Sequence, residues 1–175
     1  ERNQRETREK MNKPVYVTRF NNETFEQNVN YCNKHDKNKC IYNTPVVFNN
    51  KSRENDNIYI LEMNNSTNKI VGIGMITPRS YVRKHKMYKD PNYNRYSYEG
   101  KIRLSINDCT KKIVEIVEDL EKVIFYTKGH IKRGQGIQCL PMNAYRICED
   151  RCETQNKGLY DYINELFAYK KCALT

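Results

Sequence analysis

Long apolar stretches are absent from this chain of 175 residues. No run approaches the roughly 20 apolar residues that a membrane-spanning helix needs. The first ten residues, ERNQRETREK, also lack the apolar core of a secretion signal. We therefore expect a soluble, intracellular protein of the cytoplasm or the nucleus that is not secreted and has no membrane partner.

Patterns typical of catalytic and cofactor-binding sites are absent as well. The three histidines are isolated in the sequence, and no serine or cysteine lies in a nucleophile motif. Gly72-Ile73-Gly74 lacks the third glycine of a dinucleotide-binding motif, and Gly134-Gln135-Gly136 does not match a phosphate-binding loop. A nuclease would need a cluster of carboxylates around a metal ion, which the sequence does not provide. We therefore expect neither an enzyme nor a cofactor.

Cysteine, by contrast, is plentiful. Seven cysteines, an odd number, indicate reduced thiols or metal ligands in an intracellular protein. Cys32, His35 and Cys40 have the spacing C-x2-H-x4-C, which offers three of the four ligands of a structural zinc site, with the fourth from Cys148 or Cys152. Packing of Cys32 in a helix and of Cys40 in a strand explains the same pattern without a metal, and we favour that interpretation.

Positive charge is in clear excess. Lysine and arginine number 31 against 21 acidic residues, and the net charge of +10 favours a polyanionic partner such as nucleic acid. Many cations alternate with tyrosines over residues 77–98, and others lie in the glycine-rich loop 128–137. Cations neutralise phosphates and tyrosines stack on bases, although an ordinary solvated surface has the same composition. The predicted phosphate-binding residues are Arg79, Arg83, Lys84, Lys86, Arg95, Lys128, His130, Lys132 and Arg133.

The segment 58–76 predicts a β-hairpin, because β-branched residues lie on both sides of a turn-forming polar run. Its first arm is nearly all apolar, so both faces should be covered, as in the centre of a small barrel. In the second arm, one face would carry Ile70, Gly72, Gly74 and Ile76 and would be almost bare. Such a face suits a barrel corner and also allows a flat ligand to approach closely.

Helices are expected around residues 24–33, after the capping residues at 21–24, and over residues 143–171, with a joint at Gly158. A strand over 96–106 should point Arg103 outward. The clearest helix follows the capping residues Asn107 and Asp108. Its apolar stripe comprises Ile113, Ile116, Val117, Leu120, Val123 and Ile124, and its acidic outer face comprises Glu115, Glu118, Asp119 and Glu121.

Several segments occur in an order known from one superfamily. Phe20-Asn21-Asn22 precedes a helix, and Cys40-Ile41-Tyr42-Asn43-Thr44-Pro45 precedes the hairpin with its glycine-bearing second strand. In order and hydropathy, residues 19–106 resemble the PUA-like superfamily, most closely its YTH and EVE branch. This resemblance implies a small mixed β-barrel that reads a splayed or modified base in an aromatic pocket, N6-methyladenine in YTH domains.

The resemblance also implies roles for individual residues. Tyr42 would be a cage aromatic, with Asn43 and Thr44 as polar neighbours. Asn21 and Asn22 would hydrogen-bond the base, and one of Tyr81, Tyr93 or Tyr96 would form the second wall. YTH cages are largely tryptophan, which this chain lacks, but tyrosine rings also stack on bases.

The predicted fold class is therefore α+β, a small mixed PUA-like β-barrel flanked by helices. Residues 1–12 would form a polar tail, residues 13–141 the barrel domain, and residues 142–175 a helical extension packed on the same domain. The predicted function is nucleic-acid binding, with RNA favoured over DNA because aromatic pockets read splayed single-stranded bases. The alternative is a non-enzymatic scaffold or protein-interaction subunit, for example of a virus, whose C-terminal helices bind a protein partner.

Overall fold

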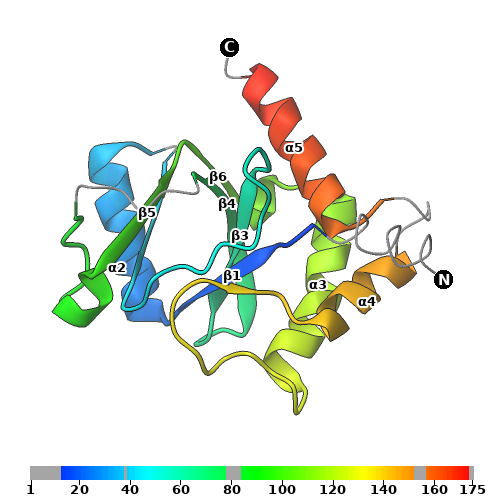
Figure 1. Ribbon diagram of the computed structural model, residues 1–175, viewed down its shortest axis with the longest axis horizontal. Coiled ribbons are helices and arrows are strands. Elements are labelled where there is room, and N and C mark those ends of the chain that lie inside the picture. Colours follow the sequence, from blue (N-terminus) through cyan, green and yellow to red (C-terminus); the bar gives the residue numbers. More distant parts are fainter. Residues whose placement is uncertain (1–12, 38, 78–83, 152–156, 174–175) are drawn as a thin grey trace.

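The computed structural model describes residues 13–37, 39–77, 84–151 and 157–173 (Figure 1). The predicted polar tail at 1–12 lies outside this part. The architecture is α+β, as the sequence predicts. The strands are β1 (Tyr16–Phe20), β2 (Cys40–Thr44), β3 (Ile58–Asn64), β4 (Lys69–Ile76), β5 (Tyr96–Gly100), β6 (Ile102–Ser105) and β7 (Gln138–Cys139). The helices are α2 (Asn22–His35), α3 (Lys111–Tyr126), α4 (Met142–Arg151) and α5 (Leu159–Ala173), with short 3₁₀ turns η1 (Pro91–Asn94) and η2 (Ile106–Asp108).

The strands of the described residues form two sheets. One has five strands in the order β6-β4-β3-β1-β7, and the other consists of β2 and β5. β1 runs parallel to β3, while the remaining pairs are antiparallel. The expected closed barrel is not observed, because β2 and β5 pair with each other and not with the edge strands β6 and β7.

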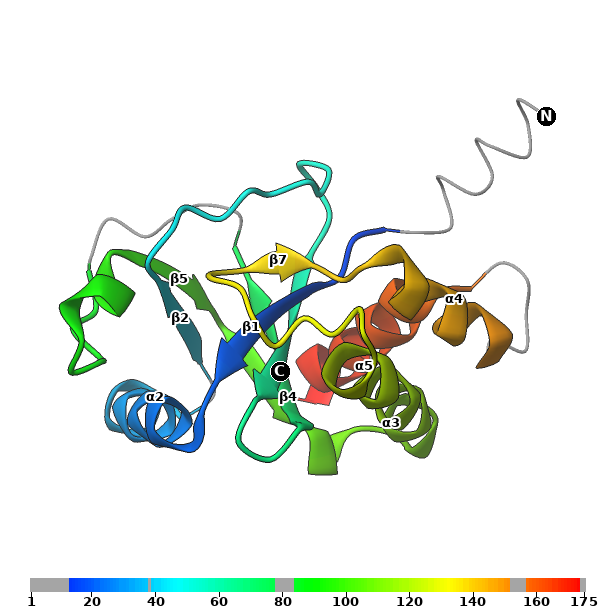
Figure 2. The same ribbon diagram turned by 90° about the horizontal axis from the view of Figure 1, so that it is seen from below.

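The five-stranded sheet has a layer of other elements on each of its faces (Figure 2). It separates the two larger clusters of buried apolar side chains among the described residues, which we call the larger and the smaller core. Helices α3, α4 and α5 cover one face, and their apolar side chains form the larger core with β1, β3, β4 and β6. The β2–β5 ladder covers the other face, where Tyr16, Phe20, Tyr42 and Tyr98 contribute to the smaller core. Within the described residues, no helix is both long enough and apolar enough to cross a membrane.

The predicted hairpin is confirmed as β3 and β4, and all seven residues of β3 are buried. The predicted alternation in β4 is wrong at Ile70, because the register shifts between Glu62 and Met63. This irregularity places Ile70, together with Ile73, in the larger core beside the helices, which we also call the helix-side core. Ile76 lies in the smaller core on the other face of the sheet.

The face of β4 that carries Gly72 and Gly74 is filled by the protein's own side chains. A methyl group at Gly74 would lie 2.0 Å from the Tyr42 hydroxyl, and one at Gly72 would lie 2.5 Å from Arg103 and 2.6 Å from Glu62. The glycines therefore admit a tyrosine and an ion pair. A flat ligand has no space at this position, so that part of the sequence interpretation is wrong.

Two charged residues also lie deeper than the sequence suggests. Arg103, expected to point outward, donates from Nη2 to Glu62 Oε2 at 2.6 Å, and the Glu62 side chain is 1% exposed. Glu121, expected on the outer face of α3, is buried and accepts the Ile70 N–H at 2.9 Å. In both cases a specific partner compensates for the burial of the carboxylate.

Helix α3 confirms the predicted apolar stripe, since all six stripe residues are buried. The helix begins later than expected, because the Thr110 side chain caps it and Asn107 and Asp108 lie in η2. The C-terminal region is helical with Gly158 just before α5, as predicted. Its buried side chains join the helix-side core, and they include Ala144, Tyr145, Cys148, Leu159, Tyr160, Ile163, Leu166 and Phe167.

Candidate functional site

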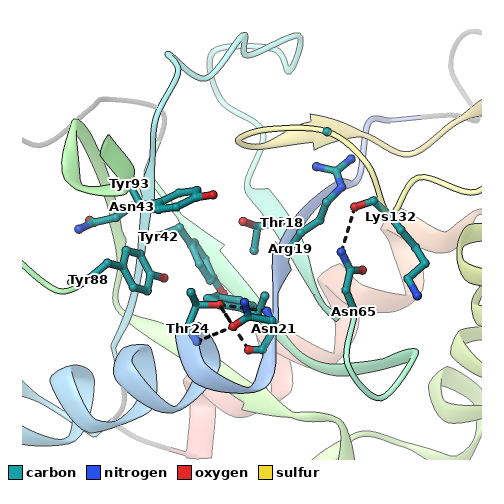
Figure 3. Close-up of a pocket in the computed structure, with 12 residues that line it drawn as sticks. Thr18, Arg19, Asn21, Thr24, Tyr42, Asn43, Asn65, Tyr88, Tyr93 and Lys132 are labelled. Carbon is teal, nitrogen blue, oxygen red and sulfur yellow. Dashed lines mark hydrogen bonds between the residues drawn. The ribbon is translucent and has the colours of Figure 1, made fainter. Parts of the chain in front are cut away.

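A pocket of about 210 Å³ lies beside the end of β1 (Figure 3). We refer to it as the β1 pocket. Its lining comes from β1, the start of α2, β2, the hairpin turn, the segment 88–93 and the loop that precedes β7. The residues are Thr18, Arg19, Phe20, Asn21, Thr24, Tyr42, Asn43, Asn65, Tyr88, Tyr93, Lys132 and Gly134.

The pocket exists because β7 is short. β7 pairs with Tyr16 and Val17, so within the described residues the rest of β1 has no strand neighbour on that side. The loop 129–137 passes there instead of a strand (Figure 2). A sheet edge that is open in this way leaves side chains and backbone accessible to a ligand.

Three tyrosines form the aromatic side of the pocket. Tyr42 is almost fully buried, and its hydroxyl donates to Glu62 Oε1 at 2.7 Å. Burial, reinforced by the neighbouring Glu62 charge, raises the pKa of Tyr42 well above its usual value, so the phenol stays protonated. The rings of Tyr88 and Tyr93 meet edge to face, with centroids 6.3 Å apart, and Tyr93 is 43% exposed.

Beneath the pocket, Glu62 connects Tyr42 to Arg103. The Arg103 guanidinium donates from Nε at 2.9 Å and from Nη2 at 2.6 Å. Burial alone would lower the pKa of Arg103, but the charge and hydrogen bonds of Glu62 outweigh burial and raise it. Arg103 thus remains charged, and its hydrogen bonds to Glu62 hold the acceptor of the Tyr42 hydroxyl in one place.

The asparagines of the pocket differ in how much hydrogen-bonding capacity they retain. Asn21 caps α2, since its Oδ1 accepts the Thr24 N–H at 2.8 Å. Asn43 is internally bonded, because it donates to the His85 carbonyl at 2.6 Å and accepts from Ser97 at 2.7 Å. Asn65 donates to the Lys132 carbonyl at 2.9 Å, but its buried Oδ1 has no partner among the described residues.

Arg19 and Lys132 supply positive charge on the side opposite the tyrosines (Figure 3). Arg19 donates from Nη2 to Gln138 at 2.6 Å and from Nη1 to the Gly136 carbonyl at 3.3 Å. Within the described residues no carboxylate pairs with it, and none lines the pocket. Burial therefore lowers the pKa of Arg19, which still remains protonated.

The loop before β7 is shaped around this guanidinium. Gly134 and Gly136 have φ angles of 152° and 72°, which L side chains rarely adopt. A methyl group at Gly134 would lie 3.0 Å from Arg19 Nη2. The two glycines thus allow the backbone to wrap closely around Arg19.

The residues predicted to bind a base are partly brought together. Asn21, Tyr42, Asn43 and Tyr93 line the pocket. Asn22 bonds to Asn64, Thr44 bonds to the Val46 carbonyl, and Tyr96 lies outside the lining. Tyr81 lies outside the described residues.

The predicted phosphate-binding residues are more scattered. Lys132 lines the pocket. Lys84, Lys86, Arg95, Lys128, His130 and Arg133 are exposed but do not contribute to its lining, and Arg79 and Arg83 lie outside the described residues.

Sequence reasoning missed Thr18, Arg19, Phe20, Thr24, Asn65, Tyr88 and Gly134. A signal was present for Thr18, because it interrupts the apolar row that Tyr16 and Phe20 form on one face of the strand. Tyr88 also had a signal, because it lies in the basic, tyrosine-rich segment 77–98, although it was not among the predicted base-binding residues. No comparable signal marks Asn65, which reaches the pocket only through the tertiary fold.

The described zinc candidates contact other groups of the protein. Cys32 lies near Asn28 Oδ1 at 3.8 Å, Cys40 near the Met75 carbonyl at 3.6 Å, and His35 stacks on Tyr31. Cys148 lies in the helix-side core, and Cys152 is outside the described residues. Among the side chains that the structure describes, no group of three or more histidine, cysteine and acidic residues could hold a metal ion.

Comparisons with protein-family models, with curated proteins and with solved structures found no match to this chain.

Proposed function

We propose that this protein is a nucleic-acid-binding module that holds a splayed or modified base of single-stranded RNA in the β1 pocket. The proposal depends on one observation. A single small pocket combines three tyrosines, three asparagines and two cations, and no carboxylate is among its described lining residues. Aromatic rings stack on bases, amides can bond to base edges, and cations attract the phosphates beside the base.

The size of the pocket supports a ligand of one ring system. Its volume of about 210 Å³ is below the roughly 300 to 1,000 Å³ of sites for drug-sized molecules. A single base can enter such a space while the sugar and phosphate remain at the rim. In RNA, bases that are unstacked in this way occur in single strands, loops and bulges, which favours RNA over duplex DNA.

The charge of Arg19 supports an anionic ligand. A partly buried guanidinium without a carboxylate partner is unfavourable, because burial removes hydration that no opposite charge replaces. A phosphate group at the rim would supply that opposite charge, and the net charge of +10 would attract the polyanion from a distance.

A relationship to the PUA-like superfamily and its YTH and EVE branch is part of the proposal. The succession of β1, α2, β2 and the β3–β4 hairpin supports it, as does the presence of Tyr42 and Asn21 in one pocket. In this proposal the two sheets correspond to a barrel that has opened between the β2–β5 ladder and the main sheet.

The direct test is the affinity for short single-stranded RNA, measured by fluorescence anisotropy. Tyr93→Ala should weaken binding at least about fivefold, because stacking of a base on an aromatic contributes roughly 1 to 3 kcal/mol. Lys132→Ala should weaken binding of all sequences alike and make it less sensitive to salt.

Two exposed side chains outside the pocket provide matched controls. Tyr96→Ala removes a tyrosine that is 36% exposed, and Lys128→Ala removes an exposed lysine of the same loop region. Both variants should bind nearly as the wild type does. Equal losses in the pocket variants and their controls would contradict the β1 pocket as the binding site.

The alternative, a protein-interaction role of the C-terminal helices, has less support. Helices α4 and α5 already bury most of their apolar side chains in the helix-side core. Large exposed apolar side chains on these helices are Met142 and Tyr169. If the protein bound no single-stranded RNA even at low salt, this alternative would replace the proposal.

A further inference from the structure

Thr18 is a polar residue on an otherwise apolar face of β1. Tyr16 and Phe20, two residues before and after it, point into the smaller core. Thr18 itself is only 6% exposed and lines the β1 pocket. Figure 3 shows it in the middle of the pocket, between the tyrosines and Arg19.

The Thr18 hydroxyl has no hydrogen-bond partner among the described residues, unlike the other threonines near the pocket. Thr44 Oγ1 donates to the Val46 carbonyl at 2.5 Å, and Thr24 Oγ1 takes part in the cap of α2. The Thr18 hydroxyl oxygen is not fully buried, since it does not belong to the buried side-chain atoms without a hydrogen-bond partner. Because Thr18 lines the pocket, this oxygen faces the open space of the pocket.

A ring that enters the pocket must therefore replace the water that hydrates this hydroxyl. A hydrocarbon edge would leave the hydroxyl buried and unbonded, which is unfavourable. A ring nitrogen, carbonyl or amino group would restore the hydrogen bond, because a hydroxyl can both donate and accept. The site thus favours a heterocycle with a polar edge.

We infer that Thr18 is a specificity-determining residue of the β1 pocket, whose hydroxyl bonds to the polar edge of the bound base while the tyrosines contact its face. This inference rests on the proposed function and adds to it the group that distinguishes one ring edge from another. Arg19, the next residue in β1, lies on the side where the phosphate would be, so consecutive residues contact the base and the backbone.

The test measures the affinity of three variants for short single-stranded oligoribonucleotides of adenine, cytosine, guanine or uracil. Thr18→Val keeps the branched shape without the hydroxyl, Thr18→Ala removes both, and Thr18→Ser keeps the hydroxyl. Thr18→Val and Thr18→Ala should each lower the affinity for the preferred oligonucleotide about 3- to 10-fold. The differences in affinity among the four oligonucleotides should therefore become smaller. The affinity of Thr18→Ser should stay within about twofold of the wild-type affinity.

Thr127→Val is the control, because Thr127 lies at the end of α3, outside the pocket, and its hydroxyl donates to the Val123 carbonyl. It should leave RNA affinity unchanged. Suppose that the wild type binds RNA with a base preference and that Thr18→Val and Thr18→Ala both retain this preference. The role of Thr18 would then be refuted, while the proposed function would stand. If the wild type bound none of the oligonucleotides, both would be refuted.

Discussion

At the scale of single residues, the position of the Tyr42 ring in the β1 pocket depends on neighbours that do not line the pocket themselves. The Tyr42 side chain lies against Gly74, and the Glu62–Arg103 pair fixes its hydroxyl. Removing one partner of a buried ion pair strongly destabilises a protein, because the other charge remains without compensation. The aromatic wall is thus held by a network that itself lies outside the pocket.

Gly74→Ala should displace the Tyr42 ring, because the added methyl group would overlap the hydroxyl. We expect a loss of about 1 to 3 kcal/mol in the free energy of unfolding, measured by urea denaturation, together with weaker RNA binding. Gly129→Ala is the control, since its nearest neighbour would be 3.5 Å away. Equal stability of the two variants would contradict close packing at Gly74.

At the scale of elements, the pocket depends on the junction between β1 and α2. Asn21 ends the strand segment and caps the helix through a reciprocal pair of bonds with Thr24. The same two residues line the pocket. Helix capping therefore also determines how this wall of the pocket is placed.

Asn21→Ala should lower the free energy of unfolding by about 1 kcal/mol, because the N-terminal amides of α2 lose their cap. Thermal or urea denaturation measures the effect. Asn21→Ser should retain most of the stability, since serine caps helices nearly as well. If alanine and serine were equally destabilising, the contribution of Asn21 would not come from capping.

At the scale of the whole molecule, many tyrosines are buried in both cores. Burial raises the pKa of Tyr59 to about 12, and it also raises the pKa values of Tyr16, Tyr42, Tyr88, Tyr145 and Tyr160. In the unfolded chain these groups ionise near pH 10. The folded state then holds more protons than the unfolded state, so its stability is fully present below about pH 10 and falls as pH rises toward 12.

We therefore expect alkaline pH to destabilise the fold, by about 1.4 kcal/mol per pH unit for each such tyrosine. Urea denaturation at about pH 8 and about pH 11 measures this change. Tyr59→Phe should make the decrease less steep, whereas Tyr126→Phe, at a residue that is 68% exposed, should not. An unfolding free energy that stayed constant over this range would contradict the argument.

Local patterns were sufficient for much of the fold. The hairpin of β3 and β4, the apolar stripe of α3 and the helices around Gly158 follow from apolar spacing and turn-forming residues within short segments. Four of the predicted base-binding residues do line the pocket. The hairpin, the stripe and the helices depend on interactions between residues that are close in the sequence. The four base-binding residues were named from the resemblance, and they come from separate segments that meet only in the folded chain.

Only the tertiary structure decided the strand register, the buried ion pair and the pocket, because these features depend on which distant segments become neighbours. The irregular pairing at Glu62 and Met63 turns Ile70 to the other face, and the strand register brings Arg103 to Glu62. The short pairing of β7 leaves the end of β1 open, so that Thr18 and Arg19 face a pocket and not a further strand. By itself, the sequence determined the elements and the charge of this protein, whereas the contacts between distant segments determined where the pocket forms.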